Sequence, residues 1–118
     1  MKHTNQTNYL NQWIQTNKVS LPDSEFALPL ITCSDGTELC IKVDENSFCS
    51  PKRKIKDMEG YDYTKVEIRF VRSFGKFIRP ETLSDFEIGS IGRYATVPVE
   101  VVDFYINQHG GYIDYNVD

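Results

Sequence analysis

The chain has 118 residues, of which 40% are hydrophobic and 13% aromatic, as is typical of one small globular domain. Its net charge of −4 disfavours a binder of long nucleic acid, because a phosphate backbone needs a basic surface. The sequence shows no N-terminal secretory signal and no apolar run long enough to span a membrane. We therefore expect a cytoplasmic protein without membrane contact, and at this size a homo-oligomer.

The first 22 residues are expected to form a helical arm. Thr4 or Thr7 could cap this helix. Four apolar residues fall on one of its faces: Tyr9, Leu10, Trp13 and Ile14. Two interpretations are open, since this face could dock on a partner subunit or pack on the chain's own sheet.

A β-hairpin is predicted around Asp35-Gly36, which lies between two apolar runs. A two-residue turn with positive φ at both positions would place Cys33 opposite Glu38 and Leu30 opposite Ile41. One face of the hairpin would then carry Leu28, Leu30, Leu39, Ile41 and Val43. The other face would carry Ile31, Cys33, Glu38, Cys40 and Lys42.

A long basic loop follows at 44–63. Four cations lie within five residues: Lys52, Arg53, Lys54 and Lys56. Together with the Ser50 hydroxyl and backbone N–H groups, they could hold a phosphate. Ten of the thirteen Lys and Arg lie between Lys52 and Arg93, and aromatic residues of this basic segment could stack on a base. The alternative is a solvated charged loop with ordinary core aromatics.

The remaining chain alternates short strands and helices. Strand 64–71 places Val66, Ile68 and Phe70 on one face. Further elements are expected at 73–78, 80–86 and 93–97, and a helix at 98–110 carries an apolar stripe of Val99, Val101, Val102, Tyr105 and Ile106. The predicted class is α+β: a small antiparallel sheet with an N-terminal and a C-terminal helix packed on it. We expect a single domain, 1–118, with its arm at 1–22, its sheet region at 26–97 and its last helix at 98–110.

Catalytic and metal-binding chemistry finds little support in the residues. The three cysteines fit reduced thiols, although a redox pair of Cys33 and Cys40 is conceivable. The two histidines, His3 and His109, are far from these thiols in sequence, so we expect neither a metal nor a cofactor. Cys49 with His109 could form a nucleophile–base pair, but no motif surrounds them. A protein that is not an enzyme is the prediction.

Five short motifs carry a resemblance to a known family. They are Asp35–Leu39, Phe48–Lys52, Tyr63–Ile68, Val97–Val102 and His109–Gly111. In these the chain resembles the Thoeris anti-defence type 1 family of bacteriophages and mobile elements, over residues 28–111.

This resemblance implies a sponge that sequesters a small cyclic nucleotide signal of host immunity in the bacterial cytosol without cleaving it. It also implies an oligomer with ligand sites between subunits. The expected ligand-binding residues are Phe48, Ser50, Pro51, Lys52, Arg53, Tyr63, Arg93 and Tyr94. The alternative is a protein inhibitor of a host defence effector, comparable to an anti-CRISPR, whose acidic segments 23–45 and 100–118 mimic nucleic acid.

Overall fold

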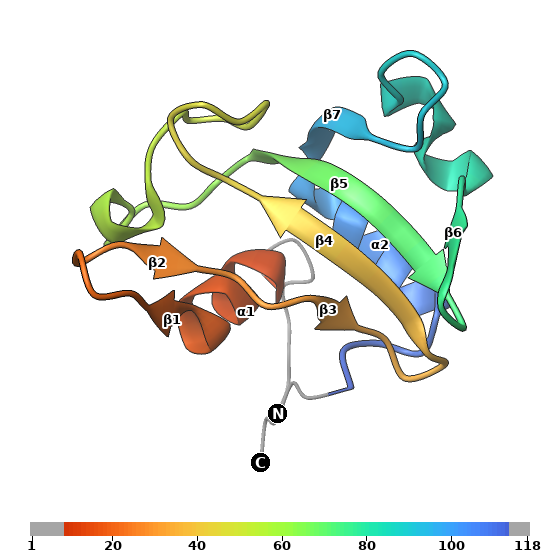
Figure 1. The fold of residues 1–118 in the computed structure, drawn as a ribbon, viewed down its shortest axis with the longest axis horizontal. Coiled ribbons are helices and arrows are strands. Elements are labelled where there is room, and N and C mark those ends of the chain that lie inside the picture. The colour runs from red at the N-terminus through yellow and green to blue at the C-terminus, as the bar shows by residue number, and fades with distance from the viewer. Residues whose placement is uncertain (1–8, 114–118) are drawn as a thin grey trace.

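The structure is a computed structural model that describes residues 9–113 (Figure 1). Its elements are, in chain order, α1 Tyr9–Asn17, β1 Val19–Ser20, β2 Phe26–Ala27, β3 Ile31–Thr32, β4 Thr37–Lys42, the 3₁₀ helix η2 Ile55–Asp57, β5 Lys65–Ser73, β6 Lys76–Ile78, the 3₁₀ helix η3 Glu81–Phe86, β7 Tyr94–Pro98 and α2 Val99–Gln108. None of the helices within 9–113 is long and apolar enough to cross a bilayer.

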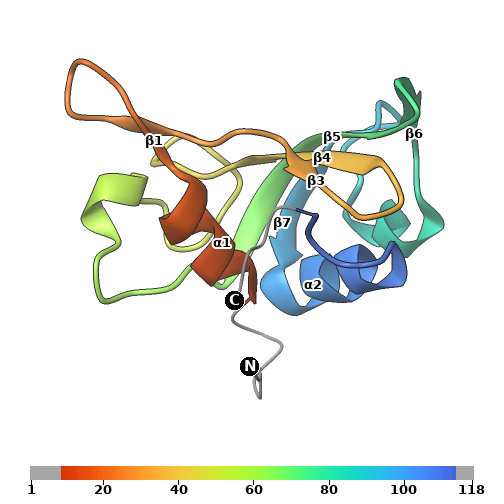
Figure 2. The same cartoon turned by 90° about the horizontal axis from the view of Figure 1, so that it is seen from below.

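The main sheet is antiparallel and has β5 at its centre. One edge of β5 pairs with β4, which in turn pairs with β3. The other edge is shared, because residues 71–73 pair with β6 and residues 65–68 pair with β7. Both α1 and α2 lie on the same side of this sheet (Figure 2). The predicted α+β class with two helices packed on an antiparallel sheet is confirmed.

The core fills the space between the sheet and the two helices. Helix α1 contributes Leu10, Trp13 and Ile14, and α2 contributes Val102 and Ile106 among others. Burial of this apolar surface is what keeps such short helices folded. The apolar face of α1 therefore packs within its own chain, as the second interpretation of the arm expected. The proposed capping residues Thr4 and Thr7 lie outside the described residues.

The Asp35-Gly36 hairpin forms, but its predicted register is wrong by one residue. Thr32 pairs with Glu38 and Ile31 pairs with Leu39. Only Gly36 has a positive φ, so the turn is a three-residue loop closed by hydrogen bonds between Cys33 and Thr37 and between Gly36 and Cys33. Consequently Ile31 and Cys33 lie on the buried face with Leu39 and Ile41, whereas Leu28 and Leu30 are only partly buried.

The strand predicted at 64–71 forms as β5, but the predicted alternation of its side chains holds only in the first half. A bulge shifts the pairing, since Cys40 lies opposite Phe70 and Ile41 lies opposite Ile68. Side chains beyond the bulge therefore change face. Val66 and Ile68 are buried as predicted, but Phe70 lies on the open face, away from the helices, and Val71 takes the core position.

Candidate functional site

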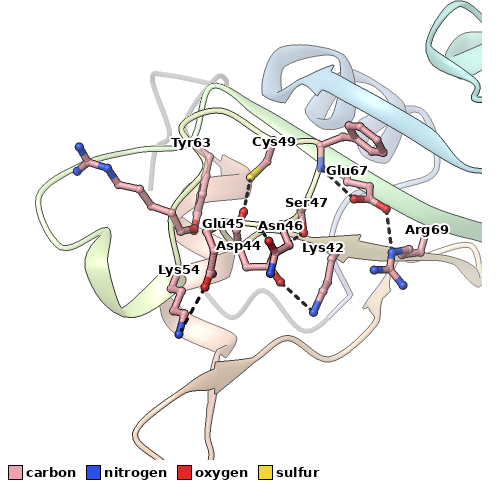
Figure 3. A network of polar contacts seen from close by, with 12 residues as sticks. Lys42, Asp44, Glu45, Asn46, Ser47, Cys49, Lys54, Tyr63, Glu67 and Arg69 are labelled. Atoms are coloured by element: carbon pink, nitrogen blue, oxygen red, sulfur yellow. Dashed lines mark hydrogen bonds and ion pairs between the residues drawn. The ribbon is translucent and has the colours of Figure 1, made fainter.

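The loop 44–63 is ordered by hydrogen bonds to its own residues and to α1. Oδ1 of Asp44 accepts bonds of 2.8 Å from the Asn46 N–H and the Ser47 hydroxyl (Figure 3). The buried side-chain amide of Asn11 donates to the Tyr63 carbonyl and accepts from the Tyr63 N–H, both at 2.9 Å. These hydrogen bonds hold the loop in a defined position against α1.

Half of the basic cluster in this loop is neutralised by Glu25, from outside the loop, and by Glu45, at its start. Lys54 lies 3.2 Å from Glu25 and 3.6 Å from Glu45, and Lys56 lies 3.0 Å from Glu25. Within the described part of the chain, Lys52 and Arg53 have no carboxylate within ion-pair distance. These two keep a charge that a ligand could use.

The eight residues predicted to bind a ligand differ in how far they are exposed and in whether their polar groups are already bonded. The rings of Tyr63 and Tyr94 are buried in the core, and the Tyr63 hydroxyl donates to the Arg53 carbonyl at 2.7 Å. The Ser50 N–H donates to the Lys65 carbonyl, and the Arg53 N–H donates to the Pro51 carbonyl, so these two backbone donors are already used. Phe48 is 44% exposed, and the Lys52 ammonium lies 5.5 Å from its ring centre.

A buried carboxylate on the open face of the sheet joins two arginines. Glu67 is 1% exposed, and its Oε2 lies 2.8 Å from Nε of both Arg69 and Arg93. Its Oε1 accepts the Phe48 N–H at 3.0 Å. Burial alone would raise the pKa of Glu67, but the Phe48 N–H and the two guanidinium groups outweigh it and lower the pKa. Glu67 is therefore charged at neutral pH.

A second carboxylate holds a third arginine nearby. Oε2 of Glu87 lies 2.8 Å from Nε of Arg79 and accepts the Gly92 N–H at 2.6 Å. These bonds lower the pKa of Glu87, the bond from Arg79 being the larger cause. Arg79 and the loop around Gly92 are thereby fixed to each other.

An open groove of about 350 Å³ lies between these two arginine centres. Its lining residues are Arg69, Phe70, Val71, Phe77, Ile78, Arg79, Ile91 and Gly92. It sits where the edge of β5 passes from pairing with β6 to pairing with β7. Its apolar wall is exposed, since Phe77 is 71% and Ile91 is 69% accessible, and Phe77 meets the Phe70 ring edge to face at 5.4 Å.

This arrangement suits a ligand that combines an anionic group with a flat apolar one. Guanidinium groups bind phosphate or carboxylate through paired hydrogen bonds, and phenyl rings stack on bases. Arg93 is the one predicted residue that contacts the carboxylate of this groove through its side chain, and Phe48 does so through its backbone. Whether Ser50, Pro51, Lys52 and Arg53 bind a ligand stays a prediction.

The three cysteine thiols are weak nucleophiles at neutral pH. Burial raises the pKa of Cys33 to about 12, and it also raises the pKa of Cys40 and Cys49. Nδ1 of His109 lies 2.6 Å from Oδ2 of Asp35, and the Cys49 thiol donates instead to the carbonyls of Asp44 and Pro51. No group of three or more metal-ligating side chains occurs between residues 9 and 113.

Most residues of the groove were not predicted from the sequence. Arg69 and Glu67 occupy the polar positions of an alternating strand, which is the pattern of a solvated face. Arg79 and Glu87 are eight residues apart, and only the fold of the intervening loop brings them together. The concentration of cations between residues 52 and 93 was the one available signal.

Comparison of the chain with protein-family models, with characterised proteins and with solved structures found no match.

Proposed function

We propose that this protein binds a small cyclic nucleotide immune signal and sequesters it without cleaving it, as an anti-defence protein of a bacteriophage. The observation that carries the binding proposal is the groove on the open sheet face, where Glu67 and Glu87 hold the two lining arginines, Arg69 and Arg79, beside exposed aromatic and aliphatic side chains. The cyclic nucleotide class and the anti-defence role follow from the family resemblance.

The size and charge of the groove support a small ligand. A volume of about 350 Å³ falls in the range of roughly 300–1,000 Å³ that small-molecule sites occupy. The cations are local, while the whole chain carries a net charge of −4. A long polyanion would meet that overall repulsion, whereas a compact ligand would meet only the local arginines.

The buried thiols support binding without turnover. A thiol whose pKa is raised by burial is protonated at neutral pH and is a poor nucleophile. Arginine forks held by carboxylates can bind a phosphate without transferring protons to it. Sequestration requires only such binding, without any chemical step.

The experiment is a thermal-shift and calorimetric titration against cyclic dinucleotides, cyclic trinucleotides and cyclic ADP-ribose isomers. A ligand that binds only the folded state raises the melting temperature by mass action. Mass spectrometry of the released ligand should return it unchanged. Absence of binding across the panel, or a hydrolysed ligand, would overturn the proposal.

Two variants locate the site. Arg79→Ala removes a groove guanidinium, and Arg53→Ala removes an unpaired cation of the loop predicted from the sequence. We expect Arg79→Ala to weaken binding by roughly tenfold or more, the worth of one charged hydrogen bond. Arg53→Ala should leave binding unchanged if the groove is the site.

The alternative of a nucleic-acid mimic that blocks a defence effector has less support. The acids Glu25, Asp44 and Glu45 line one polar hollow, but Lys42, Lys54 and Lys56 lie within 3.6 Å of them. Paired acids present little of the negative surface that a mimic requires. A pulldown with host effectors separates the two functions, since a sponge recovers none.

A further inference from the structure

One buried oxygen holds two arginines of the candidate site. Nε of Arg69, and Nε and Nη2 of Arg93, all lie 2.8 Å from Oε2 of Glu67. The side chain of Glu67 is 1% exposed, while those of Arg69 and Arg93 are 43% and 38% exposed. A ligand in the groove can therefore reach Arg69, which lines it, but not the buried carboxylate.

The Glu67 carboxylate offsets the repulsion between the two guanidinium groups. Two guanidinium groups so close together repel each other unless a negative charge lies between them. The Phe48 N–H fixes the other oxygen of Glu67 at 3.0 Å, so the carboxylate cannot rotate away. Without Glu67, each arginine would be free to turn toward solvent.

The bonding pattern leaves a particular set of donors for a ligand. Arg69 bonds Glu67 through Nε, and among the described residues its two terminal nitrogens make no hydrogen bond. Those nitrogens form a fork that matches two oxygens of one phosphate. Arg69 also lines the groove directly.

We infer that Glu67 is a positioning residue of the proposed nucleotide site, which holds Arg69 and Arg93 side by side so that the terminal nitrogens of Arg69 meet a phosphate of the ligand. This inference rests on the proposed function. It assigns to a buried acid the task of preparing a site for an anion.

Glu67→Gln distinguishes positioning from simple charge attraction by the sign of its effect. The substitution removes one negative charge and makes the groove more positive, so attraction alone predicts tighter binding of an anion. Positioning predicts the opposite, because a neutral amide no longer holds two repelling guanidinium groups in place. We expect affinity to fall by roughly tenfold to a hundredfold, the range for losing charged hydrogen bonds.

The test is calorimetry of wild type, Glu67→Gln and Glu67→Asp with cyclic di-AMP and with cyclic ADP-ribose. Glu67→Asp keeps the charge but withdraws the carboxylate by one methylene, so positioning predicts weaker binding here too. Glu59→Gln is the charge-matched control, because Glu59 is exposed and outside the groove. Its affinity should match that of wild type.

The outcomes separate the two levels of the proposal. If wild type binds a probe and both Glu67 variants bind it as tightly or more tightly, Glu67 is not a positioning residue, although the proposed function stands. If wild type binds neither these two probes nor any other member of the panel of cyclic dinucleotides, cyclic trinucleotides and cyclic ADP-ribose isomers, the function proposed for this groove fails and the role of Glu67 fails with it. Should Glu67→Gln not fold, as its melting curve would show, Glu67→Asp decides the question.

Discussion

Phe74 occupies a backbone conformation that its side chain disfavours. It forms the two-residue turn between β5 and β6 with Gly75, and the two residues have φ values of 53° and 81°. Positive φ at both positions is the geometry that favours Asn-Gly in such turns. A bulky residue there is strained, by roughly 1–2 kcal/mol. The ring is 85% exposed, so little packing compensates.

Phe74→Asn should therefore stabilise the protein. We expect the free energy of unfolding to rise by roughly 0.5–1 kcal/mol, because Asn tolerates the left-handed region and Phe does not. Urea denaturation followed by circular dichroism measures this difference. A fall in stability would show that the exposed ring contributes packing that outweighs its strain.

Phe77→Asn is the matched control on the same hairpin. Phe77 is also exposed, but its φ is not in the left-handed region and its ring packs on Phe70. This substitution should lower stability by roughly 0.5–1.5 kcal/mol, the value of an aromatic pair. Opposite signs for the two variants would confirm that backbone strain is specific to Phe74.

The two turns also show how far sequence could predict backbone geometry. Asp35-Gly36 matched the strongest hairpin dipeptide, and a hairpin forms there, but Asp35 does not adopt positive φ. The actual two-residue turn falls at Phe74-Gly75, where Gly75 suits positive φ but Phe74 does not. Local sequence therefore did not predict which of the two hairpins has the two-residue turn.

At the scale of elements, α1 and α2 meet around a buried acid. Asp103 of α2 is 2% exposed, its Oδ1 accepts the Tyr112 hydroxyl at 3.0 Å, and its Oδ2 has no hydrogen-bond partner among residues 9–113. Burial raises the pKa of Asp103 from 3.8 to about 7, against the lowering effect of Tyr112 and the N–H groups at the start of α1. The folded state therefore holds a proton that the unfolded chain releases.

This shift predicts stability that falls as pH rises. Between about pH 4 and pH 7 the folded protein binds more protons at Asp103 than the unfolded chain, so the free energy of unfolding decreases with pH and levels off above about 7. Asp103→Asn should flatten the profile over that range. Denaturant titrations of both proteins between about pH 5 and pH 8 measure it. A wild-type profile already flat there would contradict the assignment.

Asn11 ties the long loop to α1. Its two hydrogen bonds to the Tyr63 backbone are buried, so Asn11→Ala leaves a donor and an acceptor unsatisfied. We expect a loss of roughly 2–3 kcal/mol and faster amide exchange in the loop, measured by hydrogen–deuterium exchange. Asn17→Ala is the control, because its amide bonds only its own helix and is partly exposed. Unchanged exchange at 51–62 would show that other contacts order the loop.

Element prediction succeeded where one periodicity extended over the whole segment. The stripe at Val99, Val102 and Ile106 identified α2, whose observed bounds are Val99–Gln108. It failed within β5, because a bulge reverses the alternation after Ile68. The ion pairs of the loop could not be predicted, because Glu25 lies on another segment and Glu45 lies nine residues before Lys54, and only the fold brings them to that lysine.

At the scale of the whole molecule, charge and shape divide between the two faces of one sheet. The helices cover one face (Figure 2). The groove with Arg69 and Arg79 lies on the other. An acidic protein thus presents a local basic site on the surface that its helices leave open. Binding of an anion there should weaken with added salt, as charge attraction is screened.

The most direct test of the groove as a nucleotide site is an amide-resolved NMR titration of the isotope-labelled protein with cyclic di-AMP and with cyclic ADP-ribose. The groove predicts that one of these ligands shifts the amides of Arg69, Phe77, Ile91 and Gly92, and leaves those of Ser50 to Arg53 unchanged. Shifts confined to the loop at Ser50–Arg53, or no shifts with either ligand, would contradict it.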